Sequence, residues 1–221
     1  MLFSSRQSLY QIISASFCVI VVISNIISAK MVYIPFVESF AIPAGLITYP
    51  LTFLLSDLTT EIFGEKKAKL MIYIAFALNI LSFGIIYVAL QLPAISEQEQ
   101  IAFQAVLGLS GLRIFSSLVA FVTAQVVDIQ LYALIKRWTG PQHLWLRNNG
   151  STLTSQLVDT LMIDIIYLYW GLGMTFDQVL PIMGFSYCYK AFFSVFNTPI
   201  FYLLVSTTKA LWKPKLEPVS V

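Results

Sequence analysis

Long apolar runs constrain this chain of 221 residues more than any other feature. Each run of about 20 residues is long enough to cross a hydrocarbon core of about 30 Å. The composition agrees, because 58% of the residues are hydrophobic and only 11% are charged. Soluble domains hold roughly 45–50% apolar and 25% charged residues, and a water-soluble fold cannot bury the excess. The sequence therefore predicts an all-α integral membrane protein, with the lipid bilayer around most of its surface.

Six apolar windows predict a bundle of six transmembrane helices, in a single domain that covers residues 1–221. Clusters of charge, glycine or proline bound each window. Cys18 and Cys188 fall inside apolar windows, so we expect small buried hydrophobic side chains there rather than a disulfide or a metal site. The expected helices are Leu9–Ala29, Ile42–Phe63, Ala68–Leu92, Leu109–Ile135, Ser151–Leu172 and Pro181–Thr208.

Basic residues set the expected orientation. An even number of crossings puts both termini on one side, and most lysines and arginines near helix ends fall on that side. Only Lys30 and Arg113 flank the opposite ends. We therefore expect cytoplasmic termini, and a first apolar run that is too long for a signal peptide and stays in the mature protein. The basic residues on the terminal side are Arg6, Lys66, Lys67, Lys69, Lys136, Arg137, Arg147, Lys209, Lys213 and Lys215.

The remaining composition argues against several functional classes. A net charge of +2, mixed with acidic residues, does not suit a nucleic-acid partner. The sequence contains no phosphate-binding loop and no metal-ligand cluster, and its single histidine, His143, has no matched nucleophile. We therefore expect no enzyme, no cofactor and no metal site. Any function must lie within the helix bundle.

Acidic and amide side chains occur inside the predicted transmembrane helices, where the burial of a polar group in the bilayer is energetically unfavourable. An ionised side chain at the bilayer centre costs at least about 2.5–3.5 kcal/mol. A hydrogen bond between two helices stabilises a membrane protein by only about 0.6 kcal/mol on average. Such a structural role can account for a single buried glutamine, but it does not account for three carboxylates at the same depth. We expect these carboxylates to converge on one layer and line a path for a proton or a solute. The pairs, each on one helix face, are Asp57 with Glu61, Gln125 with Asp128, and Gln156 with Asp159.

The last expected helix, Pro181–Thr208, supplies the opposite wall of the predicted polar site. Lys190 is the only base deep inside a predicted helix, and Asn197 lies two turns further on the same stripe. We expect Lys190 to pair with an acid on another helix, either as a structural ion pair or beside a substrate. Pro199 predicts a kink. Asn25 and Lys30 face the expected external entrance, where Lys30 is expected chiefly to reach the lipid headgroups.

These residues form an ordered series that resembles the vitamin uptake transporter family of queuosine precursor transporters. The resemblance spans most of the chain and is densest over residues 144–152, the sequence LWLRNNGST. One departure is Asn197, where many members are expected to have an aspartate, so a proton relay there is in doubt. The other matching segments are Asn25 to Lys30, Tyr49-Pro50-Leu51, Ser56-Asp57, Thr60 to Gly64, Ala124-Gln125 with Asp128, Ser155-Gln156, Asp159-Thr160, Tyr189-Lys190 and Asn197-Thr198-Pro199.

The resemblance implies a bacterial inner-membrane importer of 7-deazaguanine bases: 7-cyano-7-deazaguanine, 7-aminomethyl-7-deazaguanine or queuine, used for tRNA queuosine modification. It implies recognition or proton coupling by Asp57, Asp128 and Asp159. The other expected substrate contacts are Glu61, the orienting amides of Gln125 and Gln156, and the wall formed by Lys190 and Asn197. Candidates for a gate or entrance are Asn25, Lys30, Arg147, Asn148 and Asn149, although Asn149 or Ser151 can also simply cap the fifth helix.

Two other functions stay open. A substrate-capture subunit that needs a separate ATPase is compatible with six helices and no ATPase motif. An intramembrane carboxylate enzyme, such as an aspartyl protease, is less favoured because no Gly-x-Gly-Asp segment is present. Which precursor is carried, how transport is energised and whether the bundle forms a homodimer also stay open.

Overall fold

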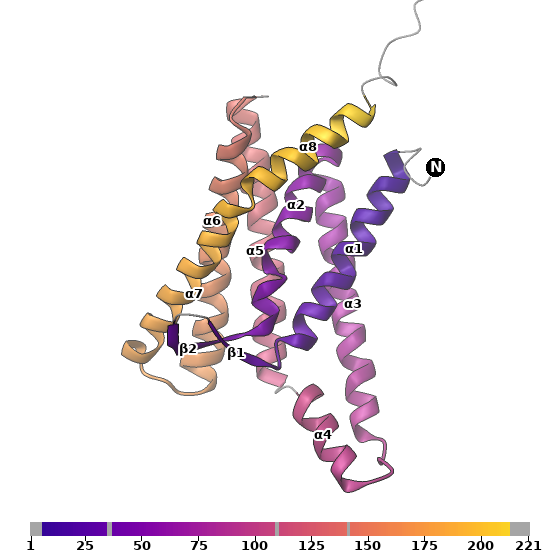
Figure 1. Cartoon of the computed structure of the whole chain (residues 1–221), viewed down its shortest axis with the longest axis vertical. Helices are drawn as coiled ribbons and strands as arrows, with labels where there is room; N and C mark the ends of the chain where they lie inside the picture. The colour runs from indigo at the N-terminus through magenta and orange to yellow at the C-terminus, as the bar shows by residue number, and fades with distance from the viewer. Residues whose placement is uncertain (1–5, 35–36, 109–110, 141, 213–221) are drawn as a thin grey trace, which may run out of the picture.

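The structure, a computed structural model, describes residues 6–34, 37–108, 111–140 and 142–212. It is a bundle of long helices with one small antiparallel hairpin (Figure 1). The elements are α1 Arg6–Ile27, β1 Met31–Ile34, β2 Val37–Pro43, the 3-10 helix η1 Ala44–Ile47, α2 Tyr49–Phe63, α3 Glu65–Gln91, α4 Glu97–Leu107, α5 Gly111–Thr139, α6 Leu144–Ile163, the π-helix η2 Asp164–Gly171, α7 Phe176–Phe196 and α8 Thr198–Trp212.

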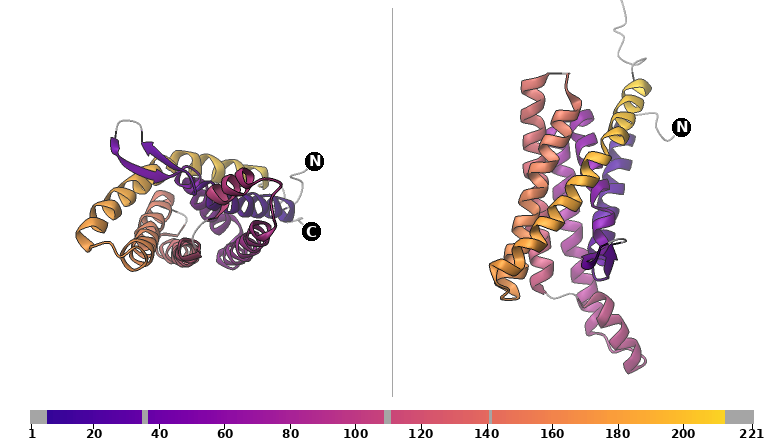
Figure 2. Two further views of the ribbon diagram at one scale, coloured as in Figure 1. Left: turned by 90° about the horizontal axis from the view of Figure 1, so that it is seen from below. Right: turned by 60° about the vertical axis from the view of Figure 1, so that its left-hand side comes forward.

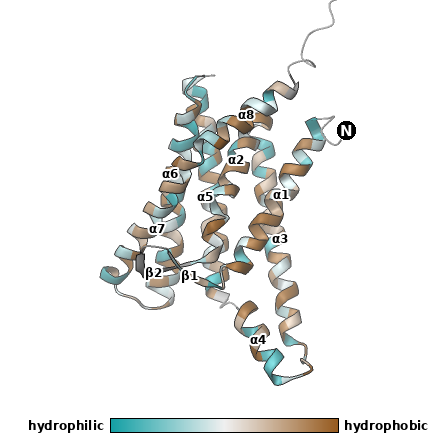
Figure 3. Cartoon of the chain, viewed as in Figure 1, coloured by the Kyte–Doolittle hydropathy of each residue, from teal (hydrophilic) through white to brown (hydrophobic). Residues whose placement is uncertain are grey.

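The helices run along the long axis of the bundle in alternating directions. In Figure 1, α1, α3 and α6 descend, whereas α2, α5 and the α7–α8 pair ascend, so α1 begins and α8 ends at the same end. Hydrophilic residues gather at helix ends such as the start of α1 (Figure 3). Among the described residues, 4 stretches are long and apolar enough to cross a membrane: Arg6–Ile27, Glu65–Gln91, Glu97–Thr139 and Phe176–Ala210. The chain is thus an all-α membrane protein in outline.

The short helix α2 is the most enclosed element. It has 15 residues, about 22 Å at 1.5 Å per residue, and it contacts α1, α3, α5, α7 and α8. Its neighbours bury an apolar cluster that includes Phe17, Met71 and Phe201. Because α2 is surrounded by protein, polar residues on it meet other side chains instead of lipid. Polar positions in the bundle interior are the expected place for functional groups.

The prediction that one helix spans residues 42–63 is wrong at its start. Residues up to Pro43 form the hairpin, in which Met31 pairs with Pro43 and Val32 with Ile42. A short apolar run does not distinguish a strand from a helix by composition. After η1, α2 begins at Tyr49, with Pro50 in its first turn, where a missing N–H costs nothing. A Cβ at Gly45 would clash with Ser28 and Ser24, so glycine lets η1 approach α1 closely.

Other helix boundaries also differ from the predicted ones. The helix expected to start at Ser151 begins at Leu144, with His143 as its N-cap, so the prediction that Asn149 or Ser151 caps it is wrong. Its far end becomes the π-helix η2, a form that often marks functional sites. The polar segment between α3 and α5, expected as a loop, contains α4, which is capped by the Ser96 hydroxyl. The end of α3 and α4 extend beyond the other helices as an arm (Figure 2).

The kink predicted from Pro199 is present. α7 ends at Phe196 and α8 begins at Thr198, with the single residue Asn197 between them. Pro199 has no N–H to donate to the preceding turn, which explains the interruption at this point. Asn197 still accepts a hydrogen bond from the Phe201 N–H at 3.0 Å. The two helices therefore form one bent path along the bundle.

Most basic residues of the described chain lie at the end of the bundle where α1 begins and α8 ends: at the start of α1 and α3, the end of α5, the start of α6 and the end of α8. Lys30, Arg113 and Lys190 are the exceptions. This is the asymmetry from which the sequence predicts orientation. Lys213, Lys215 and Leu109, the expected start of the fourth helix, lie outside the described residues. Six crossings and cytoplasmic termini stay predictions.

Candidate functional site

One face of α6 lines the interior of the bundle with polar side chains. Asn148, Thr152, Gln156 and Asp159 are spaced by four, four and three residues, which places them on one stripe of a helix. All four are buried. Two cavities lie along this stripe, and α2 and α7 contribute to the walls of both. The stripe therefore marks the polar interior that we treat as the candidate site.

The larger of these two, here called the hairpin cavity, has a volume of about 110 Å³. One water needs only about 10–15 Å³, so this space is large enough for a small solute. It lies between α1, η1, α2, α5, α6 and α7, close to the end of β2. Its lining combines aromatic faces with polar groups: Tyr49, Phe121, Asn25, Ser117, Asp159 and Lys190.

A buried ion pair forms one wall of the hairpin cavity. The Lys190 Nζ lies 2.7 Å from an Asp159 carboxylate oxygen, and each side chain is only 6% exposed. Lys190 also donates to the Thr160 hydroxyl at 3.1 Å, and its Nζ lies 4.9 Å from the centre of the Tyr49 ring. An acid on another helix is the partner that the sequence predicts for Lys190. The wall offers a carboxylate and an ammonium side by side.

The opposite rim of the hairpin cavity is an amide and hydroxyl network. Asn25 donates to the Asn79 side-chain oxygen at 2.7 Å and accepts from the Ser117 hydroxyl at 3.1 Å, which joins α1, α3 and α5. Asn25 lines the cavity, as an entrance residue would. Lys30 is exposed after the end of α1 and does not line this cavity. Of the two expected entrance residues, Asn25 is thus at the site and Lys30 is at the surface.

The smaller cavity, here called the amide cavity, has a volume of about 10 Å³. Its polar lining includes Asp57, Asn148, Gln156 and Asn197. It therefore holds no more than about one water. Asn197 brings the bend between α7 and α8 to this cavity. Three of the predicted substrate contacts, Asp57, Gln156 and Asn197, thus lie here together with the gate candidate Asn148.

Asp57 on α2 and Asp128 on α5 are neighbours and are here called the carboxyl pair. Asp57 accepts from the Thr152 hydroxyl at 3.2 Å, and Asp128 accepts from the Ser155 hydroxyl at 3.0 Å. The second oxygen of each carboxyl group has no hydrogen-bond partner among the described residues. The same holds for both amide atoms of Gln125 within the described chain. Both acids are at most 1% exposed.

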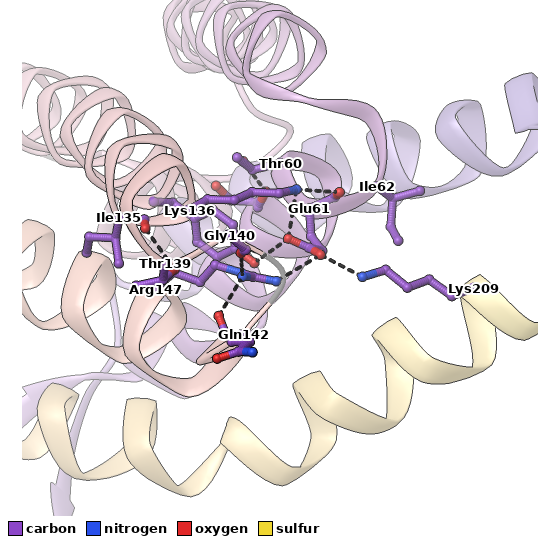
Figure 4. Close-up of polar contacts among 12 residues, drawn as sticks. Thr60, Glu61, Ile62, Ile135, Lys136, Thr139, Gly140, Gln142, Arg147 and Lys209 are labelled. Atoms are coloured by element: carbon purple, nitrogen blue, oxygen red, sulfur yellow. Dashed lines mark hydrogen bonds and ion pairs between the residues drawn. The ribbon is translucent and has the colours of Figure 1, made fainter.

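Glu61 lies one turn beyond Asp57 on α2, and its carboxylate forms ion pairs with three basic side chains. Glu61 lies 3.1 Å from Arg147, 2.9 Å from Lys136 and 2.7 Å from Lys209, and it accepts a hydrogen bond from Tyr132 at 3.1 Å. Arg147 also donates to two carbonyl oxygens of the segment before α6 (Figure 4). We call these five side chains the Glu61 hub. The hub ties α2, α5, α6 and α8 together at the basic end of the bundle.

The expected layer of three carboxylates divides into two places. Asp57 and Asp128 meet, but Asp159 lies about one helical turn away along α6 and pairs with Lys190. Glu61, expected to contact substrate, sits in the hub instead. Of the gate candidates, Arg147 joins the hub, Asn148 lines the amide cavity, and Asn149 exchanges hydrogen bonds with Thr198 at the start of α8.

Sequence reasoning missed the residues that support these acids. Thr152 and Ser155 are small hydroxyl residues on the same helix as Gln156, and their helical spacing was a usable signal. Lys136 and Lys209 were counted only as orientation signals, because their contact with Glu61 joins positions 75 and 148 residues apart. Tyr49 stands in a segment that matches the family, but the sequence assigned it no contact with Lys190 or with the cavity.

Comparisons with known proteins identify relatives. The family described as "Putative vitamin uptake transporter" matches residues 43–204. A "Probable queuosine precursor transporter" of Bacillus subtilis (strain 168) is 32% identical over 144 residues, which are 63% of this chain and 63% of that protein. The "Queuosine precursor transporter" of Escherichia coli (strain K12) is 29% identical over 169 residues, 73% of this chain and 72% of that protein. The chain thus matches just under two thirds of the length of the Bacillus protein. No solved structure matches the chain.

Proposed function

Because the chain belongs to the vitamin uptake transporter family, we propose that it imports a queuosine precursor, a 7-deazaguanine base, across the bacterial inner membrane. The names of the two relatives, "Probable queuosine precursor transporter" and "Queuosine precursor transporter", support this proposal. We further propose that residues 1–221 form one transport domain of six crossings with cytoplasmic termini. The Glu61 hub then lies at the cytoplasmic end and the hairpin at the external end.

The proposed binding site is the hairpin cavity. A 7-deazaguanine presents ring N–H and amino donors next to a carbonyl acceptor, and it therefore needs an acceptor and a donor side by side. Asp159 and Lys190, 2.7 Å apart, supply that pair. This juxtaposition in a cavity of about 110 Å³ is the observation that carries the proposal. Pockets for drug-sized ligands occupy roughly 300–1,000 Å³, so the space suits a small base better than a large cofactor.

Aromatic residues complete the proposed site. Tyr49 and Phe121 both line the hairpin cavity, and stacking a base on an aromatic face contributes about 1–3 kcal/mol in nucleic-acid complexes. Asn25 and Ser117 offer further hydrogen bonds at the rim. Gln156, one turn away on α6, faces the amide cavity and stands on the route inward. A path from the hairpin cavity past the amide cavity to the Glu61 hub would follow the α6 stripe.

The proposal is tested by binding and uptake. Purified protein is titrated with labelled 7-cyano-7-deazaguanine, and uptake is measured in cells that cannot make it. Removing one member of a buried, hydrogen-bonded charge pair costs about 2 kcal/mol or more, which corresponds to about 30-fold weaker binding. We therefore expect Asp159→Asn and Lys190→Met each to weaken binding by at least that factor and to abolish uptake.

Two exposed positions provide matched controls. Asp177→Asn, in the first turn of α7, and Lys66→Met, in the first turn of α3, make the same chemical changes at exposed side chains. Both controls are expected to bind and transport like the unmodified protein. Unchanged affinity in Asp159→Asn and Lys190→Met would refute the proposed site. Absence of binding and uptake for all three precursors would refute the proposed substrate class.

A further inference from the structure

We infer that the carboxyl pair, Asp57 and Asp128, is a proton-binding site that is separate from the substrate site and couples transport to a proton gradient. This inference rests on the proposed transport function and deepens it. It starts from the unequal way in which the bundle neutralises its buried acids. Glu61 has three cations within 3.1 Å, and Asp159 has Lys190 at 2.7 Å. Within the described part of the chain, Asp57 and Asp128 have no basic partner in an ion pair.

The charged and titratable groups around the carboxyl pair do not supply the missing cation. Arg147 is engaged by Glu61 and by two carbonyl oxygens, and Lys190 is engaged by Asp159 and Thr160. The remaining titratable neighbours, which are acids and phenols, add no positive charge. They are Tyr49 and Glu61 on α2, Tyr132 on α5 and Asp159 on α6.

Hydrogen bonding leaves room for one bound proton. Thr152 and Ser155 each donate to one oxygen of the pair. The other oxygens, Asp57 Oδ1 and Asp128 Oδ2, lack partners among the described residues, and so does Gln156 Oε1, which lines the amide cavity beside Asp57. A buried polar atom without a partner is unfavourable. A proton on one carboxyl group makes an O–H donor for these free acceptors.

The surroundings of the carboxyl pair favour the binding of one proton. Two ionised carboxylates side by side in a membrane interior repel each other and lose hydration, and one proton removes the repulsion and one of the two dehydrated charges. The proton arrives from water as an O–H bond forms on a carboxylate oxygen, and it leaves as that bond breaks. No other bond changes. Release restores the repulsion, so occupancy by a proton and the local packing of α2, α5 and α6 depend on each other.

The position of the pair fits coupling. Thr152 and Asp159 lie on the same stripe of α6, so the helix that binds the carboxyl pair also carries the substrate carboxylate. Asp57 lines the amide cavity together with Asn197, at the bend of the α7–α8 path that carries Lys190. The proton site and the proposed substrate site are thus distinct, but α2, α5 and α6 contribute to both. That arrangement lets one site bias the other through a common helix.

The test uses the full chain in proteoliposomes with labelled 7-cyano-7-deazaguanine. A pH difference of one unit, acidic outside, is equivalent to about 1.4 kcal/mol and drives about tenfold accumulation when one proton accompanies each neutral substrate. We expect Asp57→Asn and Asp128→Asn to bind and exchange the substrate across the membrane but to show no accumulation above equilibrium. Asp177→Asn is the matched control and is expected to accumulate normally.

A second measurement needs no substrate. Infrared spectroscopy of the unmodified protein is expected to show the carbonyl band of a protonated carboxyl group, which disappears as the pH is raised. The band should be lost in Asp57→Asn and Asp128→Asn and kept in Asp159→Asn. Asp128→Glu keeps a carboxyl group, and it is expected to shift the band rather than remove it, which covers the case in which an asparagine variant does not fold.

Several results overturn the inference. They are normal accumulation by both asparagine variants, accumulation that follows a sodium gradient instead of a pH gradient, or an infrared band that is unchanged in those variants. The failure of the proposed function has a different signature, because the unmodified protein then neither binds nor exchanges any of the three precursors. In that case the infrared result still decides whether the carboxyl pair holds a proton.

Discussion

Asp57 and Glu61 are both buried acids on α2, one turn apart, yet their surroundings are opposite. Glu61 contacts three cations and a tyrosine hydroxyl. Asp57 contacts a threonine hydroxyl and lies beside a second acid. The same helix therefore carries one acid with three basic partners and one acid with no basic ion-pair partner among the described residues.

The difference separates two uses of intramembrane charge. A carboxylate that the fold surrounds with lysine and arginine holds helices together, and it has little capacity left for a ligand. A carboxyl group with a free oxygen and no cation retains that capacity. Counting acids in apolar helices does not distinguish these uses, but counting their cations does. The following predictions apply the same kind of substitution to both places.

The largest expected effect is that of Glu61→Gln. This change keeps the shape of the side chain but leaves Arg147, which is 2% exposed, without its counter-charge. Breaking a buried ion pair from one side typically costs about 3–5 kcal/mol. We expect thermal or denaturant unfolding of the purified protein in detergent to show a loss of that size. Stability equal to that of the unmodified protein would mean that the hub does not hold the bundle together.

A smaller effect is expected for Lys209→Met. Lys209 also contacts Glu61, but its side chain is 52% exposed. An exposed ion pair contributes only about 0.2–1 kcal/mol, and salt screens it. We expect a loss within that range, which shrinks as the ionic strength of the unfolding assay is raised. A loss of unfolding free energy as large as that of Glu61→Gln would show that the contact between Lys209 on α8 and Glu61 contributes most of the stability of the hub.

The smallest effect on stability is expected for Asp57→Asn and Asp128→Asn, despite nearly complete burial. Each change removes one of two neighbouring acids that have no basic ion-pair partner in the described part of the chain, so the lost hydrogen bond is offset by the relief of repulsion. We expect the free energy of unfolding to change by less than about 1 kcal/mol, or to rise. The same unfolding assay gives the answer. A loss of several kcal/mol in both variants would place the carboxyl pair in the same structural class as Glu61.

The sequence predicted the broad architecture because the apolar runs and the proline signal are local. The long helices, the bend before Pro199 and an acid partner for Lys190 all follow from such signals. The hairpin at Met31–Pro43 was missed because most of it lies between the first two expected helices, and its last two residues, Ile42 and Pro43, begin an apolar run that fits a helix as well as a strand. The partner of Arg147 was missed because Glu61 lies 86 residues away, and no spacing rule reaches that far.

The sequence also did not predict that Asp57 and Asp128 lie together and that Asp159 lies apart from them. Depth along a helix placed Asp57, Asp128 and Asp159 at one level, but the rotation of each helix decides which side chains face each other. α6 presents Thr152 and Ser155 to the carboxyl pair and Asp159 to Lys190. One turn of a helix therefore separates two sites that looked like one.

The bend at Asn197 has a mechanical consequence. Lys190 lies on one arm of this joint and Lys209 on the other, and each cation is anchored to a carboxylate on a different helix. The α7–α8 path thus bends at a single residue, Asn197, and has one anchored cation on each side of the bend. A change in the angle at Asn197 would therefore move both cations relative to their carboxylates, which connects the Lys190–Asp159 pair mechanically to the Lys209–Glu61 pair.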